Sequence, residues 1–193
     1  MSGRNTESAI MKSFVKLLNQ APLDKITVKA LVSDCGISRN TFYYHYQDIR
    51  DLLRATLSAV MEAVGRENPA AWQESLGACT RFALENPRAV YHIYRSAHRD
   101  LLVRCLHQLT GDSMEKLVRH LAEGLAVSDE DIALLVRFYR HALVGTLLEW
   151  LEKDMKPDVE QMISRLGVLL EGSLRQCLER IGKTPQFTNR GGS

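Results

Sequence analysis

Six side chains that follow a glycine turn have the chemistry to recognise the edges of nucleic-acid bases. In the stretch CGISRNTFYYHYQD, residues 35–48, Arg39 and Asn40 open a short helical segment just after Gly36. In the major groove of DNA an arginine can pair with guanine O6 and N7, and an asparagine can pair with adenine. Hydroxyl groups and tyrosine rings can contact thymine methyl groups or phosphates. The residues expected to face outward here are Arg39, Asn40, Thr41, Tyr43, Tyr44 and His45.

Two hydroxyl residues and the nearby cations are candidates for contacts with phosphate. Thr27 and Ser38 stand where helices are expected to begin, and the free amides of a first helical turn favour an anion. The first 60 residues contain eight Lys and Arg against five Asp and Glu, a net charge of +3, whereas the whole chain carries +2. Because positive charge gathers around the candidate helix, Lys29 is added to the expected DNA contacts.

Two short helices and a sharp turn are needed to position these side chains. Thr27 is expected to cap a helix that runs to about Asp34, and Ser38 a helix from Arg39 to about His45. Gly36 suits the turn between them, since glycine adopts left-handed backbone angles without strain. The pattern is typical of a helix-turn-helix. Its expected small core consists of Ile10, Phe14, Leu18, Val28, Leu31, Val32, Ile37, Phe42 and Tyr46.

Helical periodicity continues through the rest of the 193 residues and predicts an all-α chain of about nine helices. A first helix is expected at 5–19, a fourth from Asp48, an eighth at 128–153 and a ninth at 156–182. Asn68-Pro69 and Asn86-Pro87 suggest the starts of a fifth and a sixth helix. Gly111-Asp112 is expected to open a seventh, closed by Gly124. The expected division is a helix-turn-helix domain at 1–47, a ligand-sensing and dimerisation domain at 48–182, and a flexible tail at 183–193.

Several classes of function lack their sequence signals. Hydrophobic residues make up 45% and charged residues 25% of the chain, as in ordinary globular proteins. We expect neither a signal peptide nor a membrane span, and therefore a cytoplasmic location. The four cysteines form no C-x-x-C motif, and the histidines do not fall four apart on one face, so no metal site and no cofactor is expected. No nucleophile or phosphate-loop motif is present, and a catalytic role is not expected.

The run ITVKALVSDCGISRNTFYYHYQDIRDLL, residues 26–53, resembles the N-terminal domain of the TetR/AcrR family of bacterial repressors. The resemblance lies in Ile26-Thr27, the Gly36-Ile37-Ser38 turn, Thr41-Phe42-Tyr43, Tyr46 and Leu52-Leu53. It implies a homodimer that binds a palindromic operator in double-stranded DNA and is released or modulated by a small molecule. The family usually has a phosphate-binding lysine where this chain has Ile49, and Gln47 or Arg50 is the expected substitute. The stretch HALVGTLLEWLEKDMKPDVEQM, residues 141–162, is similar to regulators of the dihydroxyacetone kinase operon.

The last two helices are apolar over more than one face, which predicts a dimer interface. A helix this apolar must bury more than one side, and two such helices from each subunit form a four-helix contact. The alternative is an ordinary monomeric core. The expected interface residues are Leu135, Ala142, Gly145, Ile163, Leu166, Leu170 and Leu174.

The middle of the chain is rich in aromatic side chains and is expected to enclose a pocket. An apolar pocket with a few polar groups suits a small apolar or aromatic ligand. The alternative is that these rings only fill the core. The expected pocket residues are Met61, Trp72, Cys79, Phe82, Tyr91, Tyr94 and Phe138.

A second hypothesis keeps the same fold but replaces the ligand with a protein partner. In a coactivator of this kind the first helices dock onto another protein. Ile49 in place of the lysine and the pair Tyr43-Tyr44 favour this alternative, because tyrosine is enriched at protein interfaces.

Overall fold

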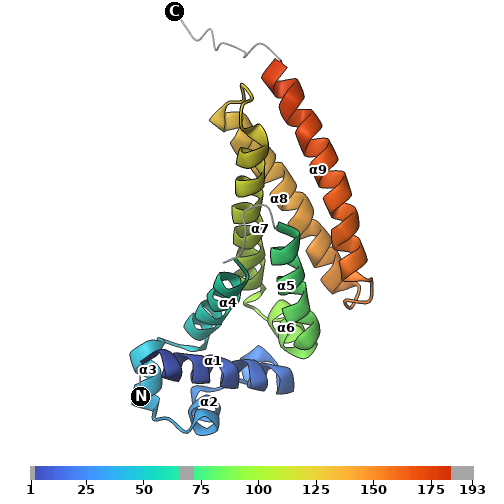
Figure 1. The fold of residues 1–193 in the computed structure, drawn as a ribbon. Helices are drawn as coiled ribbons and strands as arrows, with labels where there is room; N and C mark the ends of the chain where they lie inside the picture. The colour runs from blue at the N-terminus through green and yellow to red at the C-terminus, as the bar shows by residue number, and fades with distance from the viewer. Residues whose placement is uncertain (1–2, 66–71, 184–193) are drawn as a thin grey trace, which may run out of the picture.

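The computed structural model describes residues 3–65 and 72–183, and these residues form helices and connecting turns (Figure 1). In chain order the elements are α1 Gly3–Gln20, the 3-10 turn η1 Leu23–Lys25, α2 Val28–Cys35, α3 Arg39–His45, α4 Ile49–Gly65, α5 Trp72–Glu85, α6 Pro87–Tyr94, α7 Arg99–Ala122, α8 Asp129–Glu152 and α9 Val159–Lys183. The all-α prediction is confirmed over the described residues. The predicted helix start at Asn68-Pro69 and the tail beyond Lys183 lie outside them.

The first three helices form an N-terminal unit, which we define as α1–α3. Its core is built from Ile10, Phe14, Leu31 and Phe42, which are fully buried. Leu18, Val32 and Tyr46 are also buried, whereas Val28 and Ile37 are packed against the core and partly buried. The apolar side chains predicted for this core therefore do pack together.

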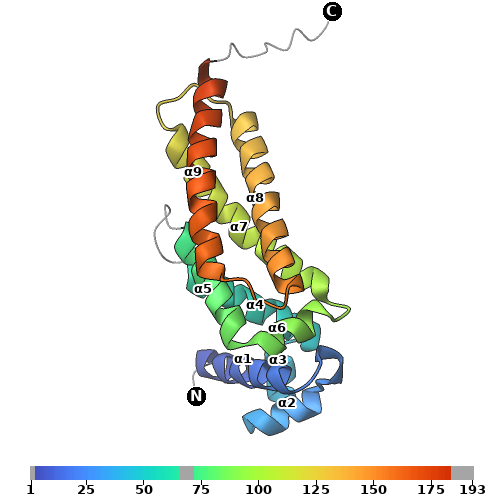
Figure 2. The ribbon, with the colours of Figure 1, turned by 90° about the vertical axis from the view of Figure 1, so that its right-hand side faces the viewer.

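The helical body, α4–α9, extends away from the N-terminal unit as a bundle of long helices. Figure 2 shows α8 and α9 side by side along most of the length of the body, and α7 packs along α8. The buried residues of the body include Met114, Val118 and Leu143 on α7 and α8, and Leu174 and Leu178 on α9. No helix in the described part of the chain is both long and apolar enough to cross a membrane.

The seventh helix differs from its prediction. It begins at Arg99 and passes through Gly111 without interruption, so the expected start at Gly111-Asp112 is wrong. A Cβ placed on Gly111 would lie 3.1 Å from Cδ of Arg140, so this glycine makes room for a side chain of α8 inside a continuous helix. Gly124 does follow the end of α7, with a φ of +78°.

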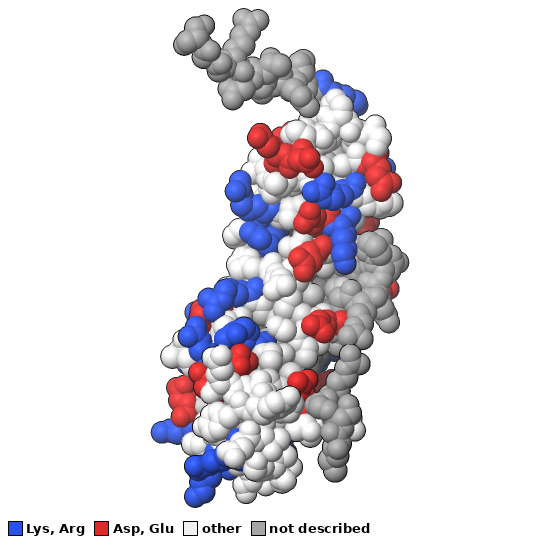
Figure 3. Space-filling model, turned by 90° about the vertical axis from the view of Figure 1, so that its left-hand side faces the viewer, with Lys and Arg blue, Asp and Glu red and all other residues white. Residues whose placement is uncertain are grey.

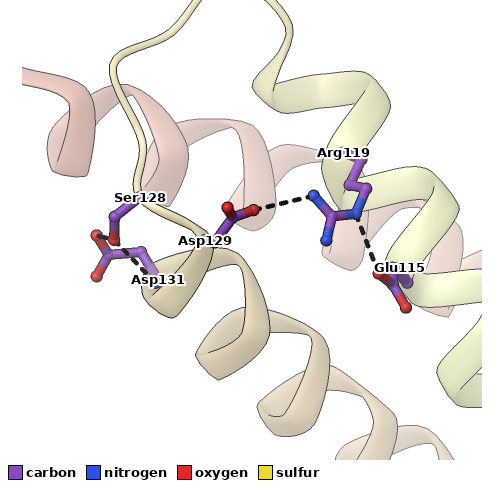
Figure 4. A network of polar contacts seen from close by, with 5 residues as sticks. All are labelled: Glu115, Arg119, Ser128, Asp129 and Asp131. Carbon is purple, nitrogen blue, oxygen red and sulfur yellow. Dashed lines mark hydrogen bonds and ion pairs between the residues drawn. The ribbon is translucent and has the colours of Figure 1, made fainter.

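The turn between α7 and α8 is held by a network of polar contacts (Figure 4). Ser128 caps α8, because its Oγ accepts a hydrogen bond of 3.1 Å from the amide of Asp131. Arg119 on α7 donates to Glu115 at 3.0 Å and to Asp129 at 3.1 Å. Three acidic residues occupy the first turn of α8, where they complement the positive end of the helix dipole.

The N-terminal unit contacts the body through α1 and α6, which lie against each other in both ribbon views (Figures 1 and 2). Asn19 accepts a hydrogen bond of 3.2 Å from the amide of Ala89 and donates one of 3.0 Å to Asn86. A ring nitrogen of His92 lies 2.6 Å from the carbonyl oxygen of Leu18. The other connection is covalent, since α4 follows α3 after three residues, and Leu52 and Leu53 of α4 are fully buried.

Candidate nucleic-acid interface and internal cavity

Local hydrogen bonds and one glycine set the position of α3. Thr27 caps α2 by accepting from the amide of Ala30 at 3.2 Å, and Ser38 caps α3 by accepting from the amide of Thr41 at 3.0 Å. Gly36 has a φ of +67°, a left-handed angle that side chains with a Cβ rarely adopt. The chain therefore turns sharply between the helices and presents α3 at the end of the molecule.

The outer face of α3 carries exposed polar and aromatic side chains. Arg39 and Asn40 are exposed, and Tyr43 and Tyr44 have exposed fractions of 57% and 85%. Phe42, on the opposite side of the helix, is fully buried and contacts the Tyr46 ring at a centroid distance of 5.8 Å. The buried ring fixes the rotation of α3, and the four exposed side chains face away from the protein.

Two residues predicted to face outward are held by the protein instead. The His45 side chain is only 8% exposed, and its ring lies 3.2 Å from the Glu7 carboxylate of α1. Thr41 is half-buried, and its hydroxyl is 2.9 Å from that of Ser38. Both face elements of the N-terminal unit, so the open surface is narrower than the sequence pattern indicated.

The cations around α3 are exposed, but the start of α4 is acidic. Lys29 and Arg50 are exposed, as is the side chain of Gln47, and Ile49 is packed against the core. Asp48 caps α4 by accepting from the amide of Asp51 at 2.7 Å. On the face drawn in Figure 3, Lys and Arg alternate with Asp and Glu along the molecule.

An acidic residue on α2 is neutralised within the N-terminal unit. Asp34 accepts hydrogen bonds from Lys16 at 2.6 Å and from Ser13 at 2.5 Å. The hydrogen bond from Lys16, followed by that from Ser13, lowers the pKa of Asp34 below its ordinary value of 3.8. The pair ties α1 to α2 and compensates one negative charge close to α3.

A cavity of about 70 Å³ lies inside the body, between α4, α5, α6, α7 and α8. Three of the predicted pocket residues, Met61, Cys79 and Phe82, line it. Trp72 lines a smaller cavity of about 10 Å³ instead. The other walls include residues that the sequence reasoning missed, such as Leu57 and Cys105. The only signal in the sequence is spacing, since Leu57 lies four residues before Met61 and Cys105 four residues before Leu109, so each pair shares one side of its helix.

The remaining predicted pocket residues lie elsewhere. The Tyr91 hydroxyl donates to the carbonyl oxygen of Leu151 at 3.1 Å, and that of Tyr94 donates to Glu152 at 2.9 Å, both at the C-terminal end of α8. Phe138 is 66% exposed on the outside of α8. The two tyrosine hydroxyls therefore bond to the end of α8, the Phe138 ring faces outward, and none of the three residues lines the cavity.

The predicted interface residues divide between the inside and the outside of the protomer. Ile163, Leu170 and Leu174 are buried in its own core, and Leu135 and Leu166 are partly buried against that core. Ala142 and Gly145 are exposed on α8. The large apolar side chains that α8 and α9 leave exposed are Leu134, Phe138, Val168 and Leu169, with exposed fractions of 53%, 66%, 80% and 63%. The interface residues predicted on α9 therefore lie on the side of the helix that packs against the protomer's own core.

Metal-binding chemistry has little support among the described residues, where no three His, Cys, Asp or Glu side chains gather around a possible ion. The rings of His107 and His141 do approach each other, with centroids 4.9 Å apart. Burial, then His141 and Arg140, lowers the pKa of His107.

Comparisons with known proteins agree with this architecture. Residues 10–56 match the family described as "Bacterial regulatory proteins, tetR family", and residues 70–172 match a "Transcriptional regulator C-terminal region". A search of curated proteins finds no match.

Fourteen chains of solved structures match this one, and three of them show the extent of the likeness. "Dihydroxyacetone kinase operon activator DhaS" is 19% identical, with a TM-score of 0.74 over 89% of this chain and 97% of that one. The TetR family repressor AlkX from Dietzia sp. strain DQ12-45-1b is 16% identical, with a TM-score of 0.52 over 92% and 97%. NalD, the secondary repressor of the MexAB-OprM multidrug efflux pump in Pseudomonas aeruginosa, is 16% identical, with a TM-score of 0.54 over 90% and 97%. At these identities the likeness concerns the fold alone.

Proposed function

The chain belongs to the TetR family of transcriptional regulators, and from this premise we propose that it binds a palindromic operator as a homodimer and that a small molecule in the body controls this binding. Repression is the expected outcome, and no catalytic step is needed. In this proposal residues 1–47, with Arg50 just beyond them, contact DNA, while the rest of residues 48–182 bind the ligand and the second subunit.

The observation that carries the proposal is the outer face of α3. A short helix with an arginine and an asparagine at its exposed start fits the major groove, where base edges differ in their hydrogen-bonding groups. Arg39 and Asn40 are held there by the Ser38 cap and by the buried Phe42 ring. Lys29 and Arg50, exposed beside this helix, are the proposed phosphate contacts, and Gln47 is a further candidate.

The exposed apolar stripes of α8 and α9 support the homodimer. Leu134, Phe138, Ala142 and Gly145 recur three or four residues apart on α8, so they share one side of the helix. Val168, Leu169 and Gly172 form the corresponding stripe on α9. A Cβ placed on Gly145 or Gly172 would have no side chain and no other helix within 4 Å. An apolar surface with small residues permits close helix packing with a second copy and removes exposed side chains from water.

The position of the cavity supports control of DNA binding by a ligand. Leu57 and Met61 of α4 line the cavity, and so do Val90 and Ile93 of α6. These two helices are also the ones that join the body to the N-terminal unit. A ligand that favours one tilt of α4 and α6 changes the distance between the two α3 helices of the dimer, which must match half-sites about one DNA turn apart. Ligand and DNA then change each other's affinity by the same factor.

The experiment that tests the proposal is capture and sequencing of DNA fragments on the purified protein. We expect a palindromic sequence, bound with an affinity that falls steeply as salt rises, because phosphate contacts release counterions. Enrichment of no sequence, together with salt-independent binding, contradicts the proposal.

Control by a ligand has its own test. Cys79→Leu partly fills the cavity without touching a DNA-facing residue, and we expect it to change operator affinity several-fold. Cys177→Leu makes the same change on α9, outside the cavity lining, and serves as the control. Equal operator affinity in the two folded variants argues against a coupled cavity.

One set of observations favours a second candidate, a coactivator that docks onto another protein. Ile49 takes the place of the usual lysine, Asp48 and Asp51 stand at the start of α4, and Tyr43 and Tyr44 are the most exposed rings of the N-terminal unit. The same salt titration on random DNA separates the candidates, because a protein-docking surface has no counterion-release slope.

A further inference from the structure

The cavity in the body has walls that carry no charge. Its lining consists of aliphatic and aromatic side chains, three sulfur-containing ones and Thr80, with no Lys, Arg, Asp or Glu among them. An ion placed there finds no compensating partner, and burying an unpaired ion costs several kcal/mol or more. The walls therefore exclude charged occupants.

The polar groups of the walls are already bonded to the protein. Thr80 Oγ1 donates to the carbonyl oxygens of Leu76 and Gly77, both at 3.1 Å. Trp150 Nε1 donates to the carbonyl oxygen of Pro157 at 3.0 Å. Since the Tyr91 and Tyr94 hydroxyls are directed toward the end of α8, they offer nothing to the cavity either. The Thr80 hydroxyl proton and the Trp150 indole N–H are therefore already donated within the protein. In exchange for its hydrogen bonds with water, a hydroxyl or amide group of an occupant finds only the lone pairs of the Thr80 oxygen and the weakly bonding thiols.

Three sulfur atoms, which are easily polarised, lie in the cavity walls. Met61, Cys79 and Cys105 all line it, and Cys105 Sγ lies 2.8 Å from Met61 Sδ. Burial raises the pKa of Cys79 to about 11, and burial followed by the neighbouring Cys79 raises the pKa of Cys105 to about 12, so both thiols are neutral. Sulfur makes favourable contacts with aromatic rings, which favours an aromatic occupant over a saturated one.

We propose that this cavity takes a compact, uncharged aromatic molecule without hydrogen-bonding groups. The proposal rests on the ligand control proposed above and narrows the ligand to one chemical class. A volume of about 70 Å³ is about half of the roughly 150 Å³ of an engineered apolar cavity that binds benzene. A single aromatic ring therefore enters only as the surrounding helices move apart, which is the movement that the proposed control by a ligand requires. An apolar cavity of this kind binds by removing apolar surface from water rather than by directed bonds.

The test compares three probes of similar size on the DNA-free protein by isothermal titration calorimetry. Toluene is the apolar probe. Phenol has a hydroxyl group in place of the methyl group of toluene, and benzoate has a negatively charged carboxylate in that place. We expect saturable binding of toluene, binding of phenol that is at least about tenfold weaker because its hydroxyl exchanges hydrogen bonds with water for few and weak partners, and no detectable binding of benzoate. Phenol or benzoate that binds as tightly as toluene overturns the proposal.

Variants place the binding in the cavity. Cys79→Leu fills part of the space and is expected to weaken toluene binding at least about tenfold, whereas Cys177→Leu on α9 leaves it unchanged. Cys105→Leu provides the same test from α7 if Cys79→Leu does not fold. Toluene affinity that is unchanged in a folded cavity variant shows that the probe binds elsewhere and overturns the proposal.

The outcomes for the ligand class and for the proposed function are separate. DNA capture needs no ligand, and toluene titration needs no DNA. A protein that binds its operator but not toluene contradicts the ligand class alone. A protein that binds toluene in the cavity but no DNA contradicts the proposed function and leaves the chemistry of the cavity as inferred.

Discussion

The N-terminal unit and the helical body expose different kinds of side chain. In the unit, Arg39 and Asn40 stand beside the exposed tyrosines 43 and 44, so hydrogen-bonding groups accompany the rings. In the body, Phe138, Val168 and Leu169 are 66%, 80% and 63% exposed and carry no polar side-chain atom. The first surface suits a polar partner with a hydrogen-bonding pattern. Burial of the second surface is favourable only because it removes apolar side chains from water.

The two regions also differ in what determines their surfaces. The face of α3 depends on Thr27, Gly36, Ser38 and Phe42, which lie within 16 positions of one another. In α9, Leu169 and Leu170 are neighbours in sequence, yet one is 63% exposed and the other only 2%. Caps and turns therefore define a small surface locally, while an apolar helix acquires its buried and exposed sides from the helices that pack against it.

The largest expected effect comes from these two leucines. Leu170→Glu buries an unpaired charge among packed side chains, so we expect the free energy of unfolding to fall by more than about 3 kcal/mol. Leu169→Glu introduces the same residue on the exposed side, and we expect a folded protein that has lost its dimer. Circular dichroism measures the first effect and light scattering the second. Two variants that unfold alike would remove the distinction between the two sides of α9.

The next effect concerns the polar surface of the N-terminal unit. Arg39→Ala is expected to weaken operator binding by about 1–3 kcal/mol and to relax the preference at one base position. Lys29→Ala is the comparison variant, expected to weaken binding similarly on all sequences because a phosphate contact carries no base preference. Fluorescence anisotropy on operator and random DNA separates the two. Equal losses on both DNAs in Arg39→Ala would make this arginine a phosphate contact as well.

A smaller effect tests how local the position of α3 is. Ser38→Ala removes the cap of α3, and we expect stability to fall by about 1 kcal/mol. Ser38→Asn keeps an acceptor at the capping position and is expected to restore most of that loss. Thermal unfolding measures both variants. If Ser38→Ala is as stable as the wild type, tertiary packing rather than the cap sets the start of α3.

The smallest expected effect is the pH dependence that Asp34 contributes. Because Lys16 and Ser13 lower its pKa in the folded state, this carboxylate stabilises the fold above the ordinary value of 3.8 and loses that contribution as pH falls through the lowered pKa. Asp34→Asn is therefore expected to be less stable than the wild type at neutral pH and to approach it in acid. Urea unfolding at several pH values measures the difference, with the exposed Asp24→Asn as control. A constant difference at all pH values would contradict the role of the charge.

Much of the N-terminal unit was predictable from the sequence. The caps Thr27 and Ser38, the left-handed Gly36 and the buried Phe42 follow from residue types that have few alternative uses, and the structure confirms them. His45 was not predictable, because its partner Glu7 lies 38 residues away on α1. The start of α7 was missed because a glycine that makes room for Arg140 looks, in sequence, like a glycine at the boundary where a new helix begins.

The sequence by itself determined the helical class, the turn before α3 and the start of that helix, since these depend on contacts a few residues apart. It also contains the motifs by which the family is recognised. The tertiary structure alone decided that Tyr91 and Tyr94 bond to the end of α8, that Cys79 and Cys105 share one cavity, and that Leu170 rather than Leu169 is buried. Helical periodicity shows that α8 and α9 are apolar on more than one side. Which side meets the core is set by the packing of helices that lie far apart in the chain.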